Sequence, residues 1–263
     1  MFDNYKEFEE IILKKSEYVV DLNEIEISPT LILPLLCECN NQNLKLSNGD
    51  NAFDYLVSKL DVDLFFKLPQ SREESDQTDF ITNFLKNVDS KYGGYFVLRH
   101  IVSELVNNVY DHSKGDNDKV QSYVLSKEYE NENKLDISVV DDGISIPGRF
   151  EKSNVVFSDD CQAIEKAIGT FSTVSHEYYE RGNGFWTIIK FVIEGNSGEI
   201  LIISRNGCLH INGDDHQYYL LEDNHEFNGT LVNVRLNKYE VQNIYNLLES
   251  KKKSYGYVSE YDY

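Results

Sequence analysis

The chain has few residues that could build a disulfide framework or a zinc centre. Its cysteines number 4, at positions 37, 39, 161 and 208. Cys37 and Cys39 lie two apart on a predicted helix, where they face different ways. No second pair matches them at the spacing of a zinc site. We therefore expect free thiols in a reducing compartment.

Long hydrophobic runs are also absent. No apolar stretch approaches the roughly 20 residues that a membrane-spanning helix needs. The first residues, Met1-Phe-Asp-Asn-Tyr-Lys-Glu, are too polar and too acidic for a secretory signal peptide. Together with the free thiols, these absences predict a soluble cytoplasmic protein that does not insert into a membrane.

Positive charge is scarce. Lysine and arginine number 25 against 45 aspartates and glutamates, which gives a formal net charge of -20. A surface this negative repels a phosphate backbone, so we expect no nucleic-acid partner. The charge does not exclude a small anion, because a metal ion and helix N-termini can hold one locally.

What remains is a globular composition, with 41% hydrophobic and 13% aromatic residues in a chain of 263. The first part alternates helical and strand patterns, which predicts a small α/β domain over residues 1–70. The expected helices cover residues 5–16, 30–40 and 51–60, and the expected strands cover 18–22, 44–47 and 63–68. Ser28 and Pro29 are typical of a helix N-cap and its first position. The polar residues 71–77 predict a linker.

Residues 78–252 predict an α+β domain with helices on one face of a mixed, largely antiparallel sheet. The expected helices cover residues 78–90, 95–112, 184–195 and 239–251. The expected strands cover 120–127, 135–140, 199–205, 207–212, 217–221 and 229–235. We expect a long irregular stretch at 148–181 and a frayed, Tyr-rich acidic tail at 253–263.

The helix predicted over 95–112 carries unusual polar residues. At about 100° per residue, Glu104, Asn108, Asp111 and His112 cluster on one face and the apolar residues lie opposite. A carboxylate and a carboxamide one turn apart can hold a hard cation or orient a water molecule. Taken alone, the helix leaves a solvated polar face as an equal alternative.

Three further motifs follow in order. An apolar strand ends at Asp141, where a carboxylate could accept a hydrogen bond from an exocyclic amine, and Gly143 would let the backbone approach a flat ring. Alone, that motif is more simply an Asp-Gly turn. Gly182-Asn183-Gly184 precedes a helix and could cradle phosphates, although it is neither a P-loop nor a dinucleotide fingerprint. Gly229-Thr230 opens a late strand.

In this order and spacing, the motifs resemble the GHKL ATPase superfamily. Its members share a left-handed βαβ nucleotide fold, the Bergerat fold, found in gyrase-type, chaperone-type and histidine-kinase-type ATPases. The resemblance covers about residues 78–240. It implies a two-layer α/β sandwich with ATP and Mg²⁺ as cofactors.

The resemblance also implies residue roles. Asn108 would coordinate Mg²⁺, and Glu104 would orient or deprotonate the attacking water. Asp141 would accept a hydrogen bond from the adenine amine, helped by Thr230. Gly143 would lie against the adenine ring, and Ser145 and Ile146 would also belong to the nucleotide-binding site. Gly182 and Gly184 would bind the phosphates through their backbone N–H groups, with Arg181 or Lys190 as charge partners, and Asn183 and Phe185 would also contact the nucleotide. Residues 149–181 would form the lid over ATP, with 167–173 as its recognisable segment.

Two positions depart from the family pattern. Ser145 stands where the first glycine box usually has its last glycine. If that position needs a left-handed backbone, a non-glycine residue costs about 1–2 kcal/mol, which would weaken binding by roughly ten- to thirtyfold at most. Phe185 and Trp186 stand where Leu and a small residue are common, which indicates a bulkier contact with the adenine or the lid.

The N-terminal segment resembles a STAS-type domain over about residues 17–68. The resemblance lies in a strand that leads into Ser28-Pro29-Thr30 and an apolar helix. In that family such a serine is phosphorylated by a partner kinase of the GHKL type. The N-cap role of Ser28 is the simpler explanation, and we favour it here.

The sequence therefore predicts a Mg²⁺-dependent ATP-binding protein that acts as a slow ATPase or a nucleotide-driven switch. A Ser/Thr protein kinase of the anti-sigma-factor type is the first alternative. A non-catalytic module, gated by nucleotide and bound to a protein partner or a second copy, is the next. No histidine precedes His100, so autophosphorylation on a separate histidine-bearing helix is not expected.

Overall fold

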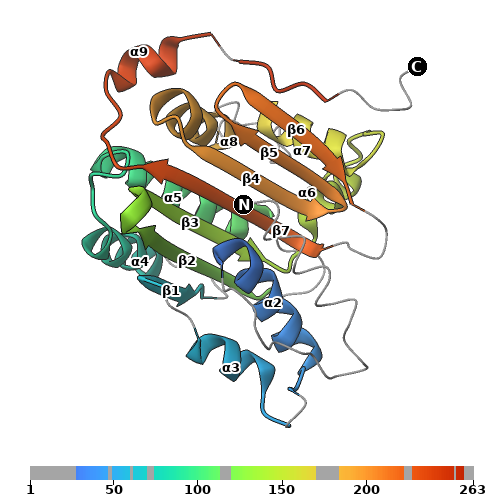
Figure 1. Ribbon diagram of the computed structural model, residues 1–263. Coiled ribbons are helices and arrows are strands. Elements are labelled where there is room, and N and C mark those ends of the chain that lie inside the picture. The colour runs from blue at the N-terminus through green and yellow to red at the C-terminus, as the bar shows by residue number, and fades with distance from the viewer. Residues whose placement is uncertain are drawn as a thin grey trace.

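A computed structural model describes residues 28–46, 49–59, 62–69, 74–112, 120–169, 184–221, 227–251 and 253–257. Within them, an antiparallel sheet has seven strands in the order β1-β2-β3-β7-β4-β5-β6 (Figure 1). The strands are β1 (Leu64–Lys67), β2 (Ser122–Tyr129), β3 (Lys134–Asp141), β4 (Glu199–Arg205), β5 (Gly207–Asn212), β6 (Asp215–Leu220) and β7 (Phe227–Asn237). The predicted α+β class is confirmed.

Strand β3 shows how the sequence fits this sheet. Leu135, Ile137 and Val139 belong to one hydrophobic cluster, and Val140 belongs to the cluster on the opposite face. Successive side chains of a strand alternate between the faces. Asp141 therefore projects to the same face as Val139.

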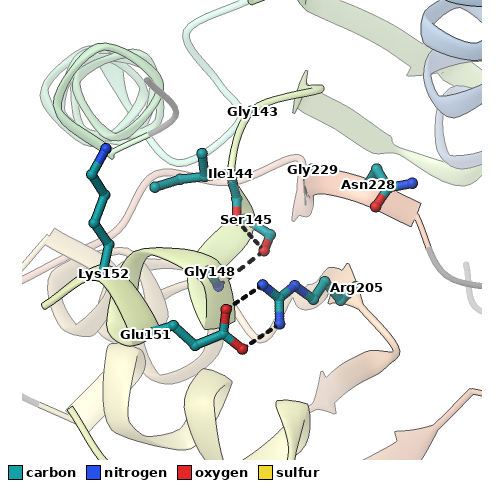
Figure 2. Close-up of a pocket in the computed structure, with 9 residues that line it drawn as sticks. All are labelled: Gly143, Ile144, Ser145, Gly148, Glu151, Lys152, Arg205, Asn228 and Gly229. Atoms are coloured by element: carbon teal, nitrogen blue, oxygen red, sulfur yellow. Dashed lines mark hydrogen bonds and ion pairs between the residues drawn. The ribbon is translucent and has the colours of Figure 1, made fainter. Parts of the chain in front are cut away.

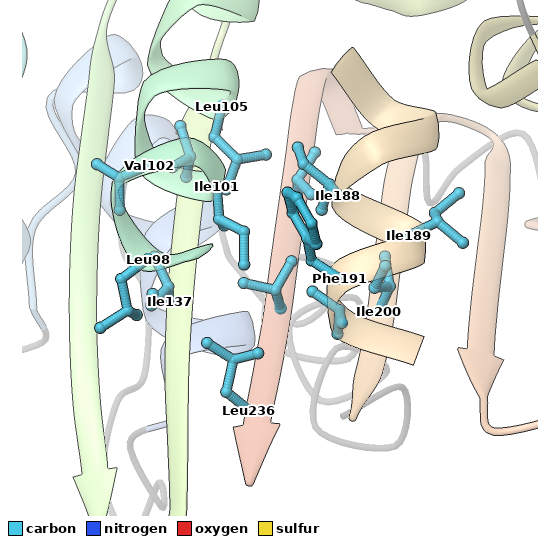
Figure 3. Packing of buried hydrophobic residues seen from close by; sticks show 14 of the residues in the cluster. Leu98, Ile101, Val102, Leu105, Ile137, Ile188, Ile189, Phe191, Ile200 and Leu236 are labelled. Carbon is cyan, nitrogen blue, oxygen red and sulfur yellow. The ribbon is translucent and has the colours of Figure 1, made fainter. Parts of the chain in front are cut away.

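A helical layer covers that face. It contains α4 (Glu74–Asn87), α5 (Tyr95–His112), α6 (Ser145–Lys152), α7 (Asp160–Gly169), and α8 (Gly184–Ile189), which continues as the π-helix η3 (Lys190–Gly195). Leu98, Ile101 and Leu105 of α5 meet Ile188 and Phe191 above the sheet (Figure 3). The bounds predicted for α5 and for the combined helix 184–195 are confirmed.

The other face carries α2 (Pro29–Gln42) and α3 (Ala52–Ser58). Ser28 is the N-cap of α2 and accepts from Leu31 N at 3.3 Å, as predicted. The helix shares a hydrophobic cluster with β2, β3, β4, β5 and β7, and β1 pairs with β2. The described part of residues 1–70 therefore shares one sheet and core with the rest of the chain, unlike the separate domain that was predicted. The helix 5–16 and the strand 18–22 lie outside the described residues.

Four local predictions differ from the structure. Residues 74–77 of the predicted linker belong to α4. The strand expected at 44–47 is reduced to a bridge between Lys45 and Asn51. The last helix, α9 (Ile244–Glu249), is shorter than predicted. The stretch from 148 contains most of α6 and all of α7 instead of irregular chain.

Helix α7 had a signal in the sequence. Cys161, Ile164 and Ile168 recur at helical spacing and are buried. Asp159 Oδ1 accepts from Gln162 N at 2.9 Å, as an N-cap residue does. The helix was not predicted, because a lid was expected over these residues. Residues 170–181, the rest of that predicted lid, lie outside the described residues.

The tail expected to fray is anchored over residues 253–257. Tyr255 is 9% exposed and belongs to the main hydrophobic cluster, and its carbonyl accepts from Tyr218 Oη at 2.7 Å. Tyr257 N donates to Glu165 Oε1 of α7 at 3.0 Å. These contacts fasten the segment to β6 and α7. In the described part of the chain, no helix is long and apolar enough to cross a membrane.

Candidate functional site

The first part of the site is the seam between α5 and the start of α8. A Cβ at Gly184 would lie 2.6 Å from Glu104 Oε2 and 3.9 Å from Asn108 Oδ1. Only a residue without a side chain lets the two helices approach so closely without moving Glu104. The structure thus brings together three residues predicted for the site from two separate motifs.

A hydrogen-bonded chain fixes this seam. The Thr187 hydroxyl donates to Gly184 O at 2.9 Å, and His100 Nε2 lies 2.7 Å from the same hydroxyl oxygen. Because the hydroxyl has given its hydrogen to Gly184, His100 is the donor. Burial lowers the pKa of His100, which keeps its imidazole neutral near pH 7. Neither His100 nor Thr187 was predicted to contribute to the site, although both lie on the predicted helices.

Glu104 and Asn108 have the environment of functional groups. Burial raises the pKa of Glu104, and the nearby charge of Asp111 raises it further. A carboxylate whose pKa moves toward neutrality is a better general base at neutral pH. Asn108 Nδ2 is buried and has no hydrogen-bond partner among the described residues. No role was predicted for Asp111, whose charge here raises the pKa of Glu104.

The second part of the site lies at the same end of the sheet. Gly93 pairs with Glu240, just beyond β7, which places the first turn of α5 beside the end of that strand. Asn108 lies about 20 Å along α5 from Tyr95 at 1.5 Å per residue. Strand β7 covers about the same length between its end and Thr230. Because α5 runs from Leu98 to Leu105 away from Leu236 of β7 (Figure 3), these lengths direct Asn108 toward the end of the sheet that carries Thr230 and Asp141.

Asp141 is held in a buried position at the end of β3. It is 7% exposed, and its Oδ1 accepts from Gly143 N at 2.9 Å. Burial raises the pKa of Asp141 to about 7; the hydrogen bond from Gly143 opposes this rise and the charge of Asp142 adds to it. A ligand group that donates a hydrogen bond to this buried carboxylate would therefore be favoured.

Thr230 stands directly opposite Asp141 in the β3–β7 pairing. Its hydroxyl lies 3.0 Å from Ser204 Oγ of β4, and Ser204 in turn accepts from Ile146 N at 2.9 Å. Ser204 therefore joins two predicted site residues, Thr230 and Ile146, across neighbouring elements. Its contribution was not predicted, because the pairing of β4 with β7 is a property of the tertiary fold.

Ser145 has a left-handed backbone, with φ of 68°. This meets the condition under which its replacement of glycine was predicted to be costly. Its hydroxyl donates to Ile144 O and accepts from Gly148 N at 3.2 Å, which satisfies an amide in the first turn of α6.

We expect Ser145→Ala to lower the free energy of unfolding by ~1 kcal/mol, because it removes the acceptor and keeps the strain. Ser145→Gly should be close to neutral, because relief of the strain offsets the lost acceptor. Urea denaturation of both variants measures this order. A Ser145→Gly variant less stable than Ser145→Ala would contradict it.

A cavity of about 450 Å³ opens beside α6 (Figure 2). On one wall, Arg205 makes two hydrogen bonds to Glu151, at 2.7 and 2.6 Å. The cavity is lined by Gly143, Ile144, Ser145, Gly148, Glu151, Lys152, Arg205, Asn228 and Gly229. Two residues predicted to bind the nucleotide, Gly143 and Ser145, lie here. Glu104, Asn108 and Gly184 do not line this cavity.

The second glycine segment is only partly described, because Arg181, Gly182 and Asn183 lie outside the described residues. Phe185 packs against the main hydrophobic cluster. Lys190, which was considered as a phosphate partner, is fully buried and donates to Leu247 O and Ser250 O, both at 2.7 Å. It binds the end of α9, so that prediction was wrong: five residues beyond Phe185, its side chain lies on a different face of the helix.

Comparison with known proteins adds little to this geometry. No protein-family profile matches the sequence, and no curated protein is significantly similar to it. Among solved structures, the chain is similar to a histidine kinase domain from Erythrobacter litoralis EL346 blue-light activated histidine kinase. The TM-score is 0.33 and the identity 12%, over 95% of this chain and 100% of that chain. A likeness of this degree carries neither a family nor an activity to this chain.

Proposed function

We propose that the chain is a Mg²⁺-dependent ATP-binding protein of the histidine-kinase-like ATPase type and that it hydrolyses ATP slowly. The closeness of Glu104 and Asn108 to the backbone of Gly184 carries this proposal. It brings the two side chains that could hold a metal ion and orient a water molecule to the N-terminus of α8, which begins at Gly184. Asp141 and Thr230, the residues proposed to meet the base, are paired at the same end of the sheet.

The donor set suits Mg²⁺. This ion is usually held by one or two protein oxygens together with substrate phosphates and water. Asn108 would offer its Oδ1, and its buried Nδ2 would gain an acceptor from the bound nucleotide. Among the described residues, no three His, Cys, Asp or Glu side chains gather as a metal site of their own. When bound, Mg²⁺ would neutralise charge on the phosphates.

Glu104 is the proposed base for hydrolysis. Its raised pKa and its position against the backbone of Gly184 suit a group that activates a water near phosphates. We expect Glu104→Gln to lower ATP turnover by about a hundredfold while ATP affinity changes little, because glutamine keeps the shape of the side chain and loses the base. Turnover measurements and calorimetric ATP titration check the two parts.

Gly184→Ala provides an independent check on the same carboxylate. The new Cβ would displace Glu104 Oε2, so turnover should fall here too, and the double variant should be no worse than Glu104→Gln alone. Gly256→Ala is the matched control, because the nearest atom to its Cβ, Glu165 Oε1, lies 3.6 Å away and the residue is outside the proposed site. Wild-type turnover by Glu104→Gln would remove Glu104 from the mechanism. ATP binding without turnover in the wild type would favour the non-catalytic module.

The geometry gives no support to phosphotransfer onto the N-terminal segment. Ser28 is 5% exposed and Thr30 is 2% exposed, and their hydroxyls lie 3.3 Å apart at the start of α2. A kinase could reach neither without displacing the first turn of the helix. Incubation with labelled ATP tests this alternative directly, and label on Ser28 would support it.

A further inference from the structure

The carboxylate of Asp142, the neighbour of Asp141, is held by two donors from outside β3. Asn41 Nδ2 of α2 donates to Oδ2 at 2.8 Å, and Gln121 N donates to Oδ1 at 2.5 Å. The Asp142 main chain is also fixed, because its N–H donates to Gln121 O at 3.0 Å. Of these two donors, Asn41 comes from α2, on the face of the sheet opposite to the helical layer that contains α5.

Helix α2 is a firm support for this contact. Leu36 and Cys37, one turn before Asn41, are buried in a cluster with Val140 of β3 and Leu231 of β7. The helix ends directly after Asn41, at Gln42. Because the C-terminal end of a helix carries partial negative charge, a carboxylate beside it is unfavourable unless a donor intervenes. The amide of Asn41 is that donor.

The position of Asp142 affects Asp141 through one short path. Asp142 joins Asp141 to Gly143, and Gly143 N donates to Asp141 Oδ1 at 2.9 Å. If Asp142 is released, the main chain on both sides of it gains freedom. The Gly143 amide then no longer holds the Asp141 carboxylate in one orientation.

We propose that Asn41 is a positioning residue for base recognition. By holding Asp142, it keeps the Asp141 carboxylate aimed at the exocyclic amine of a bound purine. The inference rests on the proposed function. It gives α2 a part in selecting the nucleotide, although the sequence places this helix outside the nucleotide-binding domain.

The test compares two nucleotides on matched variants. Asn41→Ala should weaken ATP binding by about fivefold, which is ~1 kcal/mol. It should leave unchanged the affinity for purine riboside 5′-triphosphate, which lacks the 6-amino group. Gln42→Ala is the control, because Gln42 lies next on the same helix and bonds to Glu38 instead. Asn41→Asp places a second negative charge beside Asp142 and should lose more ATP affinity. This variant provides the test if Asn41→Ala is unstable.

A second measurement tests the path through Asp142. In a variant that already carries Asp142→Ala, adding Asn41→Ala should have no further effect on ATP affinity. Unchanged ATP binding by Asn41→Ala, or equal losses for both nucleotides, would overturn the inference while the proposed function stands. A wild-type protein that binds neither nucleotide would instead overturn the proposed function itself, and this inference with it.

Discussion

Asp141→Asn is expected to make the protein more stable above pH 7 and to abolish tight ATP binding. The wild-type carboxylate is buried at the end of β3, and burial raises its pKa to about 7. Asparagine keeps the oxygen that accepts from Gly143 N and carries no charge to desolvate. Its amide would meet the adenine amine donor to donor, so we expect a loss of about a hundredfold in ATP affinity.

The pH dependence has a definite sign. The folded-state pKa of Asp141 lies above that of an unfolded aspartate, so the folded protein binds the extra proton between about pH 4 and pH 7. Wild-type stability contributed by this group is fully present below that window and is lost as the pH rises through it. The difference between Asp141→Asn and wild type should grow across the same window to about 2–4 kcal/mol.

Urea denaturation at several pH values measures this difference, and calorimetric titration measures ATP affinity. Asp79→Asn is the control, because Asp79 is an exposed carboxylate on α4. Equal stability of Asp141→Asn and wild type at pH 8 would show that the Asp141 carboxylate is not buried as described. Full ATP affinity in the variant would remove Asp141 from base recognition.

Gly229→Ala is expected to lower the free energy of unfolding by ~3 kcal/mol or more and to disrupt the end of the sheet that is proposed to bind the base. A Cβ at this position would lie 1.9 Å from Asp141 O and 2.9 Å from the Cα of Asp142. Both contacts are with backbone, which cannot rotate away. Gly229 also has φ of 148°, which side chains rarely adopt.

Gly213→Ala separates the clash from the backbone strain. Gly213 has φ of 61°, and nothing lies within 4 Å of its Cβ, so its replacement should cost only about 1–2 kcal/mol. Chemical denaturation measures both variants. Similar costs at the two positions would show that the β3–β7 contact can yield and that the clash is unimportant.

These two predictions depend on different kinds of information. Asp141 was predicted from the sequence, because an apolar strand that ends in Asp-x-Gly is a local pattern. The close approach of Gly229 to the Asp141 carbonyl was not, because β3 and β7 pair in the sheet but are separated in the chain by helices α6 to α8 and strands β4 to β6. The raised pKa likewise depends on burial, which sequence patterns do not quantify.

The helices show the same division. The bounds of α5 follow from its amphipathic period and the preceding glycines, so they were predicted correctly. Helix α7 was missed although its buried residues recur at helical spacing, because a lid was expected there. Lys190 was assigned to the phosphates by its nearness in sequence to Gly184, whereas its position on the helix directs it to α9.

By itself, the sequence determined the α+β class, the helix that carries Glu104 and Asn108, and the strand that ends at Asp141. Each of these follows from local periodicity and from turn chemistry. Only the tertiary structure decided that Gly184 lies against Glu104, that Thr230 stands opposite Asp141, and that Asn41 of α2 reaches Asp142. These contacts join residues far apart in the chain, and their geometry is set by strand pairing and helix packing, which local patterns do not encode.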